Sequence, residues 1–247
     1  MIRISKFIAL CGVTSRRGAE ALIKNDSVTV NDELPEKIGL IIDPEVDVVK
    51  VDGVVIKPVE IKLYIVLNKP RKVMTTLQDP FKRKTIADYV KSMKYRVYPI
   101  GRLDYDTEGV LLLTNDGELA FRLAHPRFGV KKIYEAIVKG EFKREQSMQI
   151  SRGVKLEDGK IGRAKVDILN FRRDKTLIRL TLTEGRKREV KQLCSGVGHP
   201  VKSLKRVEFA GITARGLNPG SWRKLTDGEL TYLSQLVGLD KDRPDKL

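Results

Sequence analysis

The run Val110-Leu111-Leu112-Leu113 constrains the fold most, because four consecutive apolar residues are typical of a strand that is buried on both faces. A loop rich in acidic residues, 101–109, precedes this run and has a glycine at each end. A buried strand is a rigid base, so the loop beside it can hold one carboxylate at the floor of a cleft. The rest of the chain is strongly basic, and a positioned acid in such a chain would face a polyanion. This combination favours chemistry on nucleic acid.

Composition narrows the class of protein further. The chain has 247 residues, of which 41% are hydrophobic, enough for one large domain or for a small and a medium one. Its longest apolar runs are too short to cross a bilayer, and its first residues lack the apolar core of a signal peptide. The two cysteines, Cys11 and Cys194, are not in a metal-type pair. We therefore expect a cytoplasmic protein with no membrane partner, no zinc site and no disulfide scaffold.

The net charge of +16 is unevenly distributed. Residues 1–60 contain eight Lys or Arg and ten Asp or Glu, whereas residues 61–247 contain 40 and 22. The first 24 residues, however, contain five Lys or Arg residues and a single acidic residue, Glu20. A polarised N-terminal part and a broadly basic remainder both suit a phosphate backbone, and the alternative is a charged surface that only aids solubility.

The N-terminal part, 1–58, is predicted to be a small domain of two helices and a few strands. Apolar residues recur at helical spacing in 4–12 and 15–25, and Ser15 is a suitable N-cap for the second helix. Strands are predicted at 27–30, 48–51 and 54–56. Asp52-Gly53 is the turn expected between the last two. Residues 57–60 are predicted to be a linker.

The second part, 62–239, is predicted to be a larger α+β domain around a mainly antiparallel mixed sheet, because strands outnumber helices without regular alternation. The strands are expected at 63–67, 96–100, 110–114, 132–138, 163–171 and 176–183. The helices are expected at 117–124, 143–151, 186–196 and 227–236. The polar residues 240–247 are expected to be frayed.

The acidic loop allows three interpretations. If Asp104, Asp106 and Glu108 lie on an extended segment, they share a face and could bind Mg²⁺ for a phosphodiester reaction. Alternatively, Asp104 is the sole reactive carboxylate, or the loop is a solvated acidic turn. His125 and His199, each followed by proline, are expected in structural or RNA-contacting roles.

Four segments narrow this choice when they are taken in order along the chain. They are Asn68-Lys69-Pro70, Gly101-Arg102-Leu103-Asp104, Lys132-Ile133-Tyr134 and the run 184–191, Glu-Gly-Arg-Lys-Arg-Glu-Val-Lys. Together they resemble the bacterial ribosomal pseudouridine synthases of the RsuA/RluB type. The N-terminal part resembles the small αL-type (S4-like) RNA-binding domain that many members carry. The resemblance covers nearly the whole chain.

The resemblance implies a role for each matching residue. Asp104 matches the catalytic aspartate, which acts on a flipped-out uridine without cofactor or metal, and Arg102 matches the arginine that helps to fill the space left by the base. Tyr134 matches the tyrosine that stacks beneath the target base, and Lys191 matches the basic residue that pairs with the aspartate. The resemblance also implies a substrate pocket that contains Val190, Lys69 and Leu103.

Ribosomal RNA or a ribosomal assembly intermediate is the partner that the resemblance implies. The candidate RNA-binding residues are basic side chains on or next to the two predicted N-terminal helices and in the run 184–191: Arg3, Lys6, Arg16, Arg17, Lys24, Arg186, Lys187 and Arg188. The chain departs from the family pattern at Arg71-Lys72, where a glycine usually follows two positions after the Lys-Pro pair, and at Glu189, where glutamine is usual. These departures concern the 68–75 loop and one hydrogen bond near the pocket.

We therefore expect site-specific isomerisation of uridine to pseudouridine in ribosomal RNA, with the large subunit favoured, by a monomeric enzyme. Two alternatives come from other classes. A ribosome-assembly RNA-binding protein with an inactive second domain would explain the charge equally well. A Mg²⁺-dependent nuclease would use the three carboxylates of the acidic loop.

Overall fold

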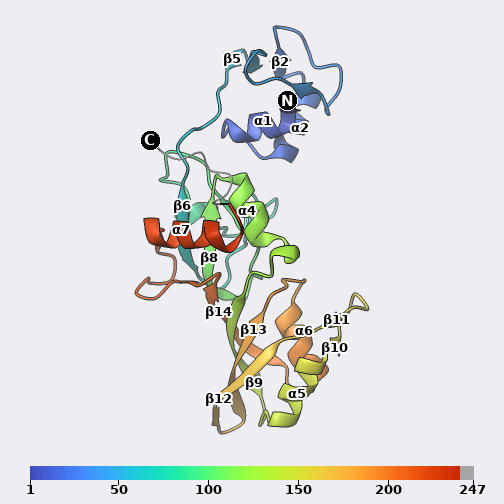
Figure 1. Cartoon of the computed structure of the whole chain (residues 1–247), viewed down its shortest axis with the longest axis vertical. Helices are drawn as coiled ribbons and strands as arrows, with labels where there is room; N and C mark the ends of the chain where they lie inside the picture. The colour runs from blue at the N-terminus through green and yellow to red at the C-terminus, as the bar shows by residue number, and fades with distance from the viewer. Residues whose placement is uncertain (240–247) are drawn as a thin grey trace. The chain divides into compact units, whose positions relative to one another are not determined.

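The computed structural model describes residues 1–239, which form two compact units (Figure 1). Unit 1 comprises residues 1–63 with 93–97, and unit 2 comprises 64–92 with 98–239. The expectation of a frayed 240–247 falls outside the described residues. No helix within residues 1–239 is long and apolar enough to cross a membrane.

Unit 1 packs two helices against short strands. Its elements are β1 (Ile2–Arg3), α1 (Ile4–Leu10), α2 (Arg16–Lys24), β2 (Val28–Val30), β3 (Ile41–Ile42), β4 (Val49–Val51) and β5 (Val54–Val55). The Ser15 side chain accepts a hydrogen bond from the Gly18 N–H at 3.0 Å, which confirms the predicted cap of α2. Asp52 and Gly53 both have positive φ, 48° and 77°, as the predicted β4–β5 hairpin requires. Apolar residues of both helices and three strands form one core.

Unit 2 is built on a nine-stranded sheet whose main strand order is β12-β13-β9-β14-β8-β6-β16, with β15 beside β14 and β7 beside β8. All its strand pairs are antiparallel except β14–β8, so the predicted α+β class with a mainly antiparallel mixed sheet is confirmed. The strands are β6 (Tyr64–Lys69), β7 (Tyr98–Pro99), β8 (Glu108–Thr114), β9 (Lys132–Lys139), β12 (Lys165–Arg172), β13 (Lys175–Leu182), β14 (Val201–Phe209), β15 (Ile212–Thr213) and β16 (Trp222–Lys224). A separate pair consists of β10 (Val154–Lys155) and β11 (Ile161–Gly162).

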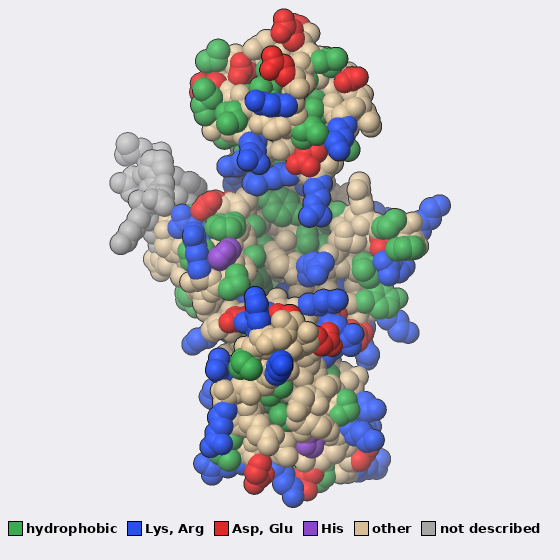
Figure 2. All heavy atoms as spheres, turned by 90° about the vertical axis from the view of Figure 1, so that its right-hand side faces the viewer, with side chains coloured by type: hydrophobic (Ala, Val, Ile, Leu, Met, Phe, Trp, Pro, Cys, Tyr) green, Lys and Arg blue, Asp and Glu red, His purple; other side chains and the backbone are tan. Residues whose placement is uncertain are grey.

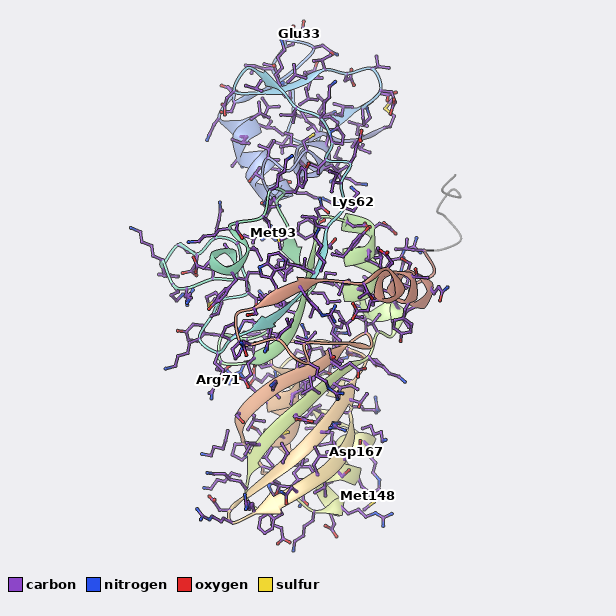
Figure 3. The ribbon with its side chains drawn as sticks, turned by 90° about the vertical axis from the view of Figure 1, so that its left-hand side faces the viewer. Glu33, Lys62, Arg71, Met93, Met148 and Asp167 are labelled. Carbon is purple, nitrogen blue, oxygen red and sulfur yellow. The ribbon has the colours of Figure 1, made fainter. Side chains whose placement is uncertain are left out.

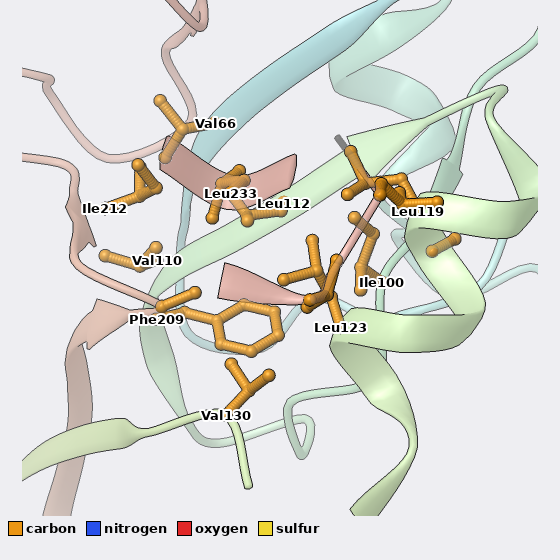
Figure 4. Packing of buried hydrophobic residues seen from close by; sticks show 14 residues of the cluster. Val66, Ile100, Val110, Leu112, Leu119, Leu123, Val130, Phe209, Ile212 and Leu233 are labelled. Carbon is orange, nitrogen blue, oxygen red and sulfur yellow. The ribbon is translucent and has the colours of Figure 1, made fainter. Parts of the chain in front are cut away.

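Two cores divide unit 2 into halves. In the first half, α4 (Gly117–Ala124) and α7 (Asp227–Leu236) pack on β6 and β8, where Leu123, Leu233 and Phe209 meet (Figure 4). In the second half, α5 (Arg144–Arg152) and α6 (Glu189–Gly196) cover β9, β12 and β13. Met148 of α5 and Asp167 of β12 lie at the same end of unit 2 (Figure 3). The short helices α3 (Ala87–Val90) and η1 (Pro126–Phe128) complete the unit.

The sheet continues from one half to the other where β8 meets β14, a ladder with two residue pairs, Lys205–Glu108 and Arg206–Gly109. Gly109 has φ of +106°, and a Cβ atom there would lie 2.1 Å from the carbonyl oxygen of Arg206. Only glycine allows the two strands to approach this closely. The acidic loop leads directly into this junction, so the sheet fixes the position of the loop.

Several expectations about the elements differ from the structure. Strand β14 was not predicted, although it lies in the middle of the sheet, and neither were the short strands β10, β11, β15 and β16. The helix predicted at 186–196 begins only at Glu189, because Arg188 has a left-handed backbone with φ of 53°. The strand predicted at 96–100 is limited to Tyr98–Pro99.

Candidate active site

A pocket lies where the two halves of unit 2 meet, with about 110 Å³ of free volume. Asp104 and Arg102 come to it from the acidic loop before β8, Tyr134 from β9 and Val190 from α6. The pocket therefore gathers four of the predicted site residues from segments far apart in the sequence. Leu103 also lines it and is buried.

Backbone and side-chain hydrogen bonds hold the loop that carries Asp104. The Thr75 hydroxyl donates to the Leu103 carbonyl at 2.7 Å and accepts from the Leu103 N–H at 3.3 Å. The Thr107 N–H donates to the Asp104 carbonyl at 3.1 Å. None of these bonds uses the Asp104 carboxylate, and the side chain of Asp104 is 37% exposed.

Lys69 does not line the pocket, which corrects its predicted place there. It is fully buried beneath the loop, and its ammonium donates to three carbonyl oxygens, those of Pro70 at 3.0 Å, Asp104 at 3.2 Å and Thr107 at 2.8 Å. Burial lowers the pKa of Lys69 to about 8, against the opposing charges of Asp106 and Asp104. Its role is to brace the backbone of the loop from below.

Lys191 forms the predicted ion pair with Asp104, and it also binds a second carboxylate. Its Nζ atom lies 3.1 Å from Asp104 Oδ2 and 2.5 Å from Asp106 Oδ1. Partial burial raises the pKa of Asp106, but the hydrogen bond and charge of Lys191 outweigh this effect and hold that pKa below its ordinary value. Asp106 thus anchors Lys191 as well as shaping the loop.

Tyr134 forms one wall of the pocket on β9. In the sheet register it lies opposite Arg206 of β14, so both side chains are on the face that α6 covers. Val190, in the first turn of α6, is buried on the same face. Arg102 is exposed at the rim of the pocket. A flat base that entered beside Asp104 would meet an aromatic ring and an apolar side chain.

The basic residues before α6 have different surroundings. Arg186 pairs with Glu184 at 2.8 Å and donates to the Ile161 carbonyl at 3.0 Å, so this side chain is already engaged. Lys187 and Arg188 are exposed, and Arg188 lines the pocket. The five predicted RNA-binding residues of unit 1 are also exposed: Arg3, Lys6, Arg16, Arg17 and Lys24. Lys and Arg side chains are spread over the surface in Figure 2.

Both departures from the family pattern have a structural explanation. Lys72 has φ of 59°, the left-handed conformation that glycine adopts without strain, and its N–H donates to the Tyr105 carbonyl at 2.7 Å. Glu189 is buried, and its Oε2 accepts the Arg186 N–H at 3.0 Å. Burial raises the pKa of Glu189. The carbonyl oxygen of a glutamine could accept the same bond.

Sequence reasoning missed three buried polar residues that line the pocket, Thr107, Lys132 and Arg206. Lys132 stands in the quoted Lys-Ile-Tyr segment, so its position beside Tyr134 was a usable signal. Burial, with the positive charge of Arg206 nearby, lowers the pKa of Lys132 to about 8. The sequence did not indicate a pocket role for Arg206. Its strand was not predicted, and a charged residue outside a predicted element is expected on a solvated surface.

The magnesium interpretation of the acidic loop gains no support from this geometry. The ammonium of Lys191 occupies the place between Asp104 and Asp106 that a cation bridging them would need. Within residues 1–239, no three or more His, Cys, Asp or Glu side chains are grouped closely enough to hold a metal ion. His125 accepts the Arg127 N–H and His199 binds the Lys139 carbonyl, so both have structural contacts.

Comparisons with known proteins find similar proteins in sequence and in structure. Residues 63–196 fit the family model described as RNA pseudouridylate synthase. The chain is 45% identical over 239 residues to an uncharacterized RNA pseudouridine synthase of Aquifex aeolicus, with 96% of each chain covered. It is 42% identical to ribosomal large subunit pseudouridine synthase B of Bacillus subtilis, with 98% of this chain and 99% of that protein covered. A crystal structure of a pseudouridylate synthase matches with a TM-score of 0.68 at 28% identity, over 94% of this chain and 100% of that one.

Proposed function

The chain belongs to the RNA pseudouridylate synthase family, and from this premise we propose that it isomerises a specific uridine of large-subunit ribosomal RNA. The likeness to the Bacillus subtilis large-subunit enzyme extends over nearly the full length of both chains, which supports this choice of substrate. The observation that carries the proposal is the Asp104–Lys191 ion pair beside the Tyr134 wall of the pocket.

In the proposed reaction the Asp104 carboxylate acts on the sugar of the target uridine. The bond between C1′ and N1 breaks and its electron pair leaves with the base. The base then turns, C5 bonds to C1′, C5 loses its proton and N1 gains one. The product has the same atoms as the substrate and no electrons are gained or lost, so the reaction is an isomerisation that needs no cofactor.

The target nucleotide must leave its helix to reach Asp104. Tyr134 stacks on the flipped base, because stacking tolerates the turn that the base makes. Arg102, exposed at the rim, occupies the space that the base has left. The exposed Lys and Arg side chains of unit 1, together with Lys187 and Arg188, bind the RNA backbone. The enzyme acts as a monomer, in the cytoplasm, on ribosomal RNA or on an assembly intermediate.

Release of tritium from C5-labelled uridine in ribosomal RNA tests the activity. The wild-type protein should release tritium, and Asp104→Asn should abolish release while RNA binding persists. Continued release by Asp104→Asn would contradict the assigned role of Asp104. Pseudouridine maps of cells with and without the gene would identify the nucleotide; identical maps would instead favour an RNA-binding assembly factor without activity.

A further inference from the structure

Buried charge is concentrated around the pocket. Four charged residues within residues 1–239 are buried as whole residues, Lys69, Lys132, Glu189 and Arg206, with exposed fractions of 0, 7, 4 and 2%. All except Glu189 are cations. Lys132, Glu189 and Arg206 line the pocket, and Lys69 lies beneath the acidic loop. A buried charge is costly unless another group compensates it, so this excess of positive charge calls for a function.

Lys132 and Arg206 are the two cations of this group that line the pocket. In the register of β9 and β14, Tyr134 lies opposite Arg206 and Lys132 opposite Phe209, so the four side chains share one face of the sheet. The ring of Phe209 lies near both cations, with its centroid 5.6 Å from Lys132 Nζ and 4.7 Å from Arg206 Cζ. The two positive charges therefore lie beside the Tyr134 wall.

Neither cation has an acidic partner at ion-pair distance among the described residues. Lys132 donates to the carbonyl oxygens of Val130 at 3.0 Å and Thr183 at 3.2 Å. Arg206 donates from Nε to the Val110 carbonyl at 2.7 Å, and its buried Nη2 has no hydrogen-bond partner. The charges of Glu189 and Glu184 act on Lys132 from beyond ion-pair distance, and Glu189 accepts the Arg186 N–H. The positive charge is thus available to a ligand.

We propose that Lys132 and Arg206 form an electrostatic site for an anion, and that this anion is the uracil base after its bond to the sugar has broken. The inference rests on the proposed function. When the C1′–N1 bond breaks, the base keeps the electron pair and carries a negative charge over N1 and its carbonyl oxygens until C5 bonds to C1′. Fixed positive charge in a site with little water stabilises such an anion without reorganisation.

Arg206→Met tests this site, because methionine keeps an apolar stem and removes the charge. Under single-turnover conditions the rate of pseudouridine formation should fall about 100- to 1,000-fold, while RNA affinity stays within a few-fold. Arg206→Lys, which keeps the charge, should recover most of the rate. Arg179→Met is the matched control: this arginine pairs with Glu135 at 2.7 Å on the other face of the same sheet, and its loss should leave the rate unchanged.

RNA with 5-fluorouridine at the target position separates a charge effect from a folding defect. Fluorine at C5 stabilises the base anion, so the enzyme needs less help from Arg206 with this substrate. The rate at which the bond between base and sugar breaks should therefore fall at least ten-fold less on Arg206→Met substitution with 5-fluorouridine than with uridine. Equal impairment on both substrates, or no impairment on uridine, would overturn the inference. If Arg206→Met does not fold, Lys132→Met gives the same comparison. Inactive wild-type protein would instead contradict the proposed function itself.

Discussion

The ammonium of Lys191 lies 3.1 Å from the carboxylate of Asp104, and this contact joins the two halves of unit 2 across the pocket. Lys191 belongs to α6, which packs in the core of the second half, whereas Asp104 belongs to the loop that enters β8. Each half has its own core, so the Asp104 carboxylate and the Lys191 ammonium are positioned by separately packed structures.

Lys191→Met should lower the rate of pseudouridine formation about 100-fold, the effect expected when a reacting group is misplaced by about 1 Å. RNA affinity should change much less, because the side chain is only 13% exposed. Single-turnover kinetics with parallel binding measurements check this. Lys187→Met removes an exposed lysine from the same segment and should affect binding rather than rate. Similar rate losses in both variants would argue against a positioning role for Lys191.

Lys69→Met should destabilise the protein by about 2–4 kcal/mol, because three carbonyl oxygens beneath the acidic loop lose their donor. Denaturant unfolding measures this loss. Arg71→Met, at an exposed position two residues away, is the control and should change stability by less than about 0.5 kcal/mol. Figure 3 labels Arg71. Equal stability of the two variants would mean that Lys69 does not brace the loop.

Glu189→Gln should stabilise the protein at neutral pH. Burial raises the pKa of Glu189, so the folded state favours the protonated carboxyl. The stability that the protonated Glu189 carboxyl contributes is therefore fully present below the ordinary pKa of glutamate. It is lost as the pH rises through the raised pKa of the folded state. Glutamine has no charge to bury and can accept the Arg186 N–H.

The Tm of Glu189→Gln at pH 7 should exceed that of the wild type by roughly 2–4 °C, the shift that about 1 kcal/mol produces in a domain of this size. The difference should shrink as the pH is lowered to about 4. Glu145→Gln, which changes an exposed acid of α5, serves as the control. A difference in Tm that does not vary with pH would refute the role assigned to the carboxyl charge.

Lys72→Gly should leave the Tm unchanged or raise it, although glycine generally destabilises a fixed backbone. The left-handed conformation costs a residue with a side chain about 1 kcal/mol, which offsets the entropy lost by glycine. Arg71→Gly, at a residue without positive φ, should lower stability by roughly 0.5–1 kcal/mol. Thermal unfolding of the two variants compares them directly, and a greater loss at position 72 would be the opposite of this expectation.

Local signals in the sequence predicted much of the fold. The Ser15 cap, the Asp52-Gly53 turn and the apolar strand Val110–Leu113 each depend on residues close together in the chain, and each is confirmed. The positions of Asp104 and Tyr134 at one pocket followed from the family resemblance, because no local pattern relates a loop to a strand 30 residues later.

Strand β14 could not be predicted, because its pattern combines two irregularities. Arg206 occupies an inward position that alternation reserves for apolar residues, since its guanidinium serves the pocket. The register with β9 then shifts between Arg206 and Glu208, so that Phe209 rather than Glu208 faces inward. Lys69 was predicted in the substrate pocket because its motif was identified. The sequence does not show that its ammonium lies beneath the loop and donates to the loop backbone.

The glycine at position 109 also limits which mutations this enzyme can tolerate. Every single-base change of a glycine codon that alters the amino acid introduces either a Cβ atom or a stop. Here the Cβ would collide with the Arg206 backbone in β14, where the two halves of unit 2 meet. A saturation library should therefore retain function only for glycine at this position, while the exposed neighbour Tyr105 accepts many replacements. Mutational tolerance in this protein thus changes sharply within five residues of Asp104.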